Sequence, residues 1–182
     1  MYEDTNEKKY LSALETLLRT FQERLDQNIG LNTHDIGFLY SLSTLAGYKI
    51  TGNEKALELS VRAADRLMER YSEKTQIIQA WGVYGFALSY AHTGILACGL
   101  LELSKHLPVL DPRKKEYEET AVQIVKSLFE NYTTEKDLSN GIIKHGVYAI
   151  TFHVGVDECC IWGDYFYVEA LMRLRNVWNM YW

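Results

Sequence analysis

The sequence has 182 residues but little of what makes loops and cross-links: only two prolines and three cysteines. So few prolines favour helices over a loop-rich or all-β chain. Three cysteines, two of them adjacent at Cys159 and Cys160, cannot complete a disulfide framework, and no Cys-x-x-Cys spacing points to zinc. We therefore expect reduced thiols, a cytoplasmic protein and no bound metal.

Signals for membranes and for nucleic acids are also missing. Residues 1–9 are polar and charged, so they lack the apolar core of a signal peptide. The most apolar stretch, residues 77–103, is interrupted by polar side chains and glycines, so we expect a buried helix and no membrane partner. The formal net charge of −5, with the acidic residues spread along the chain, disfavours a nucleic-acid partner.

Helical periodicity runs through most of the chain. One set of segments carries apolar residues at three- and four-residue steps opposite a polar face: 9–25, 54–71 and 113–132. A second set of segments carries apolar, small and aromatic residues on most sides, which is typical of helices that are packed on every side. These segments are 36–50, 80–90 and 95–103. A last helix is expected over residues 164–178, with Asn6 as the N-cap of the first helix.

The alternation of these two kinds of helix predicts an all-α fold. Polar helices would lie outside and small, aromatic helices inside a stack of αα-hairpins, with about seven helices in total. A curved or closed helical toroid satisfies this pattern, and we expect a single domain over residues 1–182.

Residues 141–162 break the helical pattern. Their β-branched and aromatic residues and glycines show no helical stripe, which predicts a long ordered loop with one short hairpin. Long ordered loops in compact domains often carry function. His145 and His153 flank the acids of this loop, but their spacing fits no standard metal-ligand pattern.

Two short motifs combine polar and aromatic residues. Thr33-His34-Asp35 precedes an apolar helix, so Thr33 or Asp35 could cap that helix, or Asp35 could act as an acid, base or charge stabiliser. Trp81 opens an inner helix, where it could belong to the core or could stack on a sugar ring. The residues alone leave these alternatives open.

The densest polar and aromatic cluster covers residues 157–165 and contains Trp162. Asp157 and Glu158 could form a pair of carboxylates, whereas Asp164 could cap the last helix.

Several segments resemble the unsaturated glucuronyl hydrolases, glycoside hydrolase family 88. They begin at residues 33, 78, 84, 97, 145 and 155, and read THDIGFLYSLS, IQAW, YGFALSY, ACGLLELS, HGVY and GVDECCIWGDYFYVEALMRL. The resemblance implies an (α/α)6 toroid fold. It also implies an enzyme that needs no metal or cofactor and whose substrates are oligosaccharides released by polysaccharide lyases, typically from glycosaminoglycans. In the implied reaction an aspartic acid protonates the C4=C5 enol ether of a terminal unsaturated uronic acid, water adds at C5, and the resulting hemiketal collapses to release the next sugar.

The resemblance also implies roles for particular residues. Asp35 matches one of the family's two key aspartates and is the expected catalytic residue. His34 lies beside the substrate in the family pattern, and Trp81 matches a ring-stacking tryptophan. His145 and Trp162 lie in matching motifs, and we expect both to bind the substrate.

The chain resembles an internally shortened member of the family. The segment that carries the family's principal acid/base aspartate is missing after IQAW, so impaired catalysis is expected. The alternative is a non-catalytic helical-hairpin module that binds a sugar or a partner chain. A homo-oligomer would cover the inner helices that the shortening leaves exposed.

Overall fold

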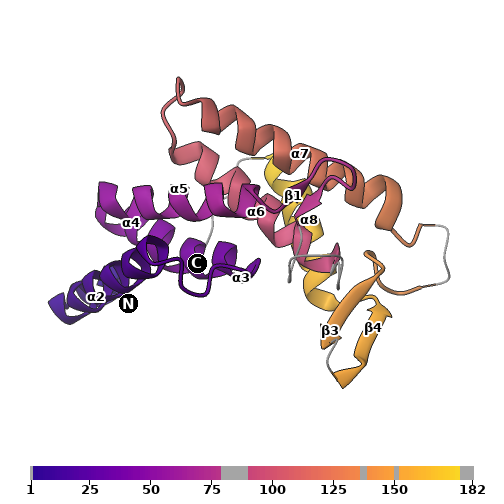
Figure 1. The fold of residues 1–182 in the computed structure, drawn as a ribbon, viewed down its shortest axis with the longest axis horizontal. Helices are drawn as coiled ribbons and strands as arrows, with labels where there is room; N and C mark the ends of the chain where they lie inside the picture. Colours follow the sequence, from indigo (N-terminus) through magenta and orange to yellow (C-terminus); the bar gives the residue numbers. More distant parts are fainter. Residues whose placement is uncertain (1, 79–89, 136–138, 150–151, 177–182) are drawn as a thin grey trace. The chain divides into compact units, whose positions relative to one another are not determined.

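The computed structural model describes residues 2–78, 90–135, 139–149 and 152–176 (Figure 1). Most of these residues are helical, and the strands among them form two short antiparallel hairpins. The prediction of an all-α protein is therefore confirmed. The chain divides into two compact units, the first up to Glu69 and the second from Arg70.

The first unit consists of helices. In chain order they are α1 (Tyr2–Thr5), α2 (Lys8–Asp26), α3 (Asp35–Tyr40), the π-helix η1 (Ser41–Leu45), α4 (Ala46–Thr51) and α5 (Glu54–Met68). A core cluster joins α2 to α5 through Leu18, Ala56 and Leu59. Helix α4 approaches α2 closely at Gly47. A Cβ at this position would lie only 2.9 Å from Leu14 Cδ1 on α2, so a larger residue would not fit without a shift.

The predicted helix over residues 36–50 is continuous but not regular. It runs as α3, η1 and α4, and the π-turn between them holds Thr44, whose hydroxyl lies 2.7 Å from that of Ser60 on α5. Both side chains are buried and out of reach of water, so the two hydroxyls satisfy each other's need for a hydrogen-bond partner. The Tyr40 hydroxyl likewise donates to the Phe21 carbonyl at 2.9 Å and so ties α3 to α2.

The second unit contains the two hairpins and three long helices. In chain order they are β1 (Tyr71–Ser72), β2 (Ile77–Ile78), α6 (Tyr90–His106), α7 (Pro112–Tyr132), β3 (Gly146–Ala149), β4 (Val154–Glu158) and α8 (Ile161–Arg175). Helix α6 packs against both α7 and α8. The β3–β4 hairpin confirms the hairpin expected within the long loop.

Three local predictions are wrong. Asn6 is not the N-cap of α2, because Glu7 occupies that position and Asn6 has a left-handed backbone with φ of 54°. Asp164 does not cap the last helix, because α8 begins earlier, at Ile161. Ile77 lies in strand β2 rather than in a helix.

Among the described residues, no helix is both long and apolar enough to cross a membrane.

Candidate functional site

The first candidate site is the turn that leads into α3. His34 is the N-cap residue of α3 and is buried, whereas the neighbouring Asp35 side chain is about half exposed. The Thr33 hydroxyl accepts from the Asp35 backbone N–H at 3.2 Å and lies 2.9 Å from Asp35 Oδ2, to which it donates. Thr33 thus holds the Asp35 carboxylate in one orientation.

The Asp35 carboxylate also faces an imidazole. His34 Nε2 lies 3.3 Å from Asp35 Oδ1, within the distance of an ion pair when the imidazole is protonated. A carboxylate beside an imidazole, with its other oxygen held, brings together two kinds of group that general acid–base chemistry uses. The arrangement can deliver a proton to a bound substrate and take one back.

Trp81 lies outside the described residues, so its predicted stacking role stays a prediction.

The second candidate site lies in the second unit, where the β3–β4 hairpin begins and ends. His145, just before β3, is hydrogen-bonded through Nδ1 to Oδ1 of Asp157 on β4. The Tyr132 ring meets the imidazole edge-on, with centroids 6.2 Å apart at an interplanar angle of 89°. The predicted pairing of Asp157 with Glu158 is not observed, since the partner of Asp157 is His145.

The loop before His145 is held by α8. Asp164 Oδ1 accepts the backbone N–H groups of Ile142 at 3.0 Å and Ile143 at 2.8 Å. Gly141 passes so close to Cys159 that a Cβ on it would lie 2.3 Å from the Cys159 Cβ. Asp164, predicted as a helix cap, therefore anchors the segment that carries His145.

Trp162 lies in the first turn of α8 and is partly buried. Its ring lies against Tyr148 of β3, with centroids 5.5 Å apart at 41°. Tyr148 itself is largely exposed. The pair offers an aromatic surface of the kind on which the apolar face of a sugar ring can stack.

A cavity of about 310 Å³ lies beside the same loop. Its lining is mostly apolar and consists of Phe129, Thr133, Thr134, Glu135, Ile142 and Tyr167. The sequence pattern did not reveal it, because the cavity depends on how the end of α7, the loop and α8 pack together.

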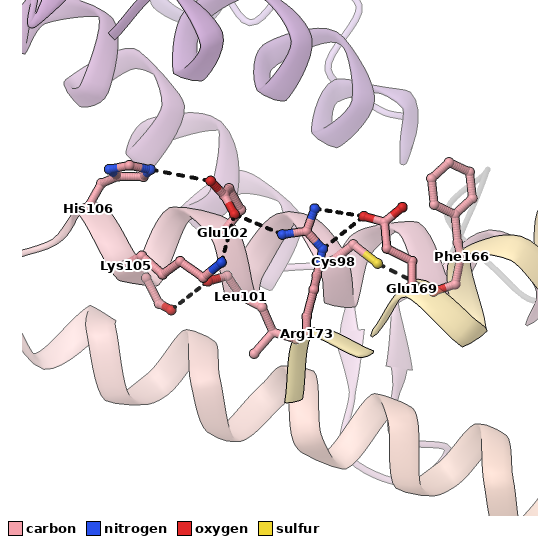
Figure 2. A network of polar contacts seen from close by, with 9 residues as sticks. Cys98, Leu101, Glu102, Lys105, His106, Phe166, Glu169 and Arg173 are labelled. Atoms are coloured by element: carbon pink, nitrogen blue, oxygen red, sulfur yellow. Dashed lines mark hydrogen bonds and ion pairs between the residues drawn. The ribbon is translucent and has the colours of Figure 1, made fainter. Parts of the chain in front are cut away.

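A buried charge network between α6 and α8 was also missed by the sequence analysis (Figure 2). Arg173 donates to Glu102 Oε2 and to Glu169 Oε1, each at 2.8 Å, and all three side chains are almost fully buried. Two features of the sequence could have indicated this network. Glu102 lies inside an apolar run, and Glu169 and Arg173 are four residues apart, so they share one face of a helix. Burial raises the pKa of the neighbouring Cys98 thiol, so Cys98 is unsuited to act as a nucleophile.

Metal ligation is not supported in the described part of the chain, where no three His, Cys, Asp or Glu side chains gather around one point.

Fold and side chains together define a class: an all-α protein with carboxylate–imidazole pairs and an exposed aromatic surface. No family model matches the chain. It is 25% identical to the unsaturated chondroitin disaccharide hydrolase of Streptococcus agalactiae, covering 100% of this chain and 80% of that protein. It is 24% identical to the unsaturated glucuronyl hydrolase of Bacillus sp. GL1, covering 100% and 84%.

Solved structures give the same result. A mutant unsaturated glucuronyl hydrolase from S. agalactiae matches with a TM-score of 0.54 and 25% identity, covering 100% of this chain and 77% of that one. A heparin-specific unsaturated glucuronyl hydrolase matches with a TM-score of 0.63 and 25% identity, covering 76% of this chain and 37% of that one. The resemblance to the unsaturated glucuronyl hydrolases is confirmed, and these relatives are hydrolases.

The comparison also bears on the shortening. The alignment with the S. agalactiae enzyme extends over 317 positions, 135 more than the 182 residues of this chain. The chain therefore lacks internal segments that this relative contains.

Proposed function

We propose that this chain is a glycoside hydrolase of the unsaturated glucuronyl hydrolase type, glycoside hydrolase family 88. Its substrate would be a lyase-derived glycosaminoglycan oligosaccharide with a terminal unsaturated uronic acid. The observation that carries the proposal is the Asp35–His34 pair, a carboxyl held by Thr33 beside an imidazole, within the segment that resembles these hydrolases in sequence.

In the proposed reaction Asp35 protonates C4 of the C4=C5 enol ether. Positive charge develops at C5 and is shared with the ring oxygen, water adds at C5, and the Asp35 carboxylate or His34 takes up the proton that the water loses. The hemiketal at C5 then collapses and releases the next sugar. The net change is the addition of one water, and it needs no metal or cofactor.

The other predicted site residues are proposed to bind the substrate. Trp81 and Trp162 would stack on sugar rings, and His145 would hydrogen-bond to a sugar hydroxyl. We propose that the missing segments make turnover slower than that of the longer relatives, since the resemblance implies that they include the family's other key aspartate.

The test is turnover of an unsaturated chondroitin or hyaluronan disaccharide, followed as loss of the ultraviolet absorbance of the enol ether. Asp35→Asn keeps the size of the side chain and one acceptor oxygen but removes the proton donor, so we expect a loss of about 10²–10⁴-fold in rate. Asp65→Asn, an exposed position on α5, is the matched control and should keep wild-type rates.

The second candidate function is a sugar-binding helical module without catalysis. The 135 alignment positions that the chain does not fill favour it, because lost segments can remove catalytic groups while binding surfaces stay. Calorimetric binding of the disaccharide by a cooperatively folded chain that shows no turnover would select this alternative over hydrolysis.

A further inference from the structure

The register of the β3–β4 hairpin leaves one residue out of the ladder. Gly146 pairs with Glu158 and Val147 pairs with Val156, so Asp157 is the extra residue of a β-bulge. Bulges re-aim a side chain and are enriched beside active sites. Here the bulge presents the Asp157 carboxylate to the imidazole of His145.

The backbone at both ends of this pair is unusual. His145 has φ of 61° and Asp157 has φ of 65°, values in the left-handed region, which is uncommon for residues other than glycine although Asp and His adopt it more often than most. An ordinary surface ion pair requires no such conformation from either residue. Both residues of this side-chain contact have a left-handed backbone conformation, which costs conformational energy. The surrounding structure therefore holds the His145–Asp157 contact despite that cost.

We propose that Asp157 is the positioning residue of His145, an inference that rests on the proposed function. In this role the Asp157 carboxylate accepts from Nδ1–H, so the neutral form of the imidazole has its lone pair on Nε2. Nε2 then accepts a hydrogen bond from a sugar hydroxyl of the substrate. Tyr132, edge-on to the ring, restricts its rotation.

The left-handed backbone at Asp157 allows a substitution by glycine that adds no backbone strain. Asp157→Gly removes the carboxylate at a position where glycine is unstrained, and Asp157→Asn keeps an oxygen acceptor at a position that asparagine tolerates. Glu158→Gln removes the adjacent carboxylate of the same strand and is the matched control.

The experiment combines ¹⁵N spectra of the His145 ring, recorded where the imidazole is neutral, with steady-state kinetics on the unsaturated disaccharide. We expect the wild type and Glu158→Gln to carry the proton on Nδ1. Asp157→Gly should show a mixture of tautomers and a several-fold loss in kcat/KM, and Asp157→Asn should recover most of both.

Asp157→Gly with the wild-type His145 spectrum would overturn the inference. So would a loss of kcat/KM that is equally large in Glu158→Gln. The spectra do not depend on turnover, so a wild type without activity would remove the proposed function while the tautomer of His145 still decides the role of Asp157.

Discussion

At the scale of single residues, Arg173 illustrates how a buried charge depends on its partners. Its guanidinium lies between Glu102 and Glu169, and the three side chains are between 1% and 6% exposed. Taking such charges out of water is costly, and the charge-assisted hydrogen bonds of Arg173, together with that of Lys105 to Glu102, offset that cost. The network therefore tolerates loss of the cation poorly.

We expect Arg173→Met to lower the free energy of unfolding by about 3–5 kcal/mol, because it leaves the buried Glu169 carboxylate without its cation and leaves Glu102 with Lys105 as its cationic partner. Urea denaturation followed by circular dichroism measures the change. Arg175→Met makes the same substitution at an exposed position of α8 and should have little effect. Equal effects of the two variants would contradict the account of the network.

Asp111 makes a second prediction at the residue scale, on the pH dependence of stability. It caps α7, and its carboxylate accepts from the Arg113 backbone N–H and side chain. These hydrogen bonds hold the pKa of Asp111 below its usual 3.8. A lowered pKa adds stability above 3.8 and loses it as the pH falls through the folded-state value.

Asp111→Asn keeps a capping oxygen but cannot titrate. Its unfolding temperature should therefore fall less steeply than that of the wild type when the pH drops below 3.8. Glu58→Gln, exposed on α5, is the control and should follow the wild type. Parallel curves for Asp111→Asn and the wild type would count against this role of Asp111.

At the scale of helices and strands, periodicity predicted most of the long elements. The stripe over residues 9–25 became α2 (Lys8–Asp26), and that over 113–132 became α7 (Pro112–Tyr132). The β1–β2 hairpin was missed because its strands have two residues each, too few to show an alternation.

The candidate sites were predictable to a different extent. Asp35 and His34 are neighbours in the chain, so their proximity follows from the sequence. The Arg173–Glu102 contact spans 71 positions and depends on how α6 crosses α8. The His145–Asp157 pair depends on a one-residue bulge, and strand register is set by packing that a single segment does not encode.

The crossing of α6 and α8 makes a prediction at this scale. A Cβ on Gly94 would lie 3.0 Å from the backbone nitrogen of Tyr167 on α8, whereas a Cβ on Gly99 of the same helix would meet nothing within 4 Å. Gly94→Ala should therefore destabilise the fold by about 1–3 kcal/mol through overpacking. Gly99→Ala should stabilise it by about 0.5–1 kcal/mol, since alanine is the better helix former.

Thermal unfolding of the two glycine variants measures the difference, and each serves as the control for the other. A Gly94→Ala protein that is as stable as Gly99→Ala would mean that α6 and α8 do not approach each other so closely.

At the scale of the whole molecule, the exposed apolar residues of α8 bear on self-association. Four of them recur at helical spacing along one stripe: Ile161, Tyr165, Val168 and Met172. An exposed apolar stripe of this kind is typical of a surface that another chain covers. Because the chain lacks segments that its longer relatives contain, a second copy is the partner that we expect.

Light scattering coupled to gel filtration tests this expectation, with the wild type predicted to have the mass of a dimer. Val168→Glu places a charge within the stripe and should shift the protein to the monomer, since an unpaired charge is costly to bury. Val122→Glu is the control: Val122 is also exposed, but it lies on α7 next to polar neighbours, so the dimer should persist. A wild type that stays monomeric at every concentration would show that this stripe of α8 remains exposed to water in the native protein. Self-association would then not replace the contacts that the missing segments make in the longer relatives.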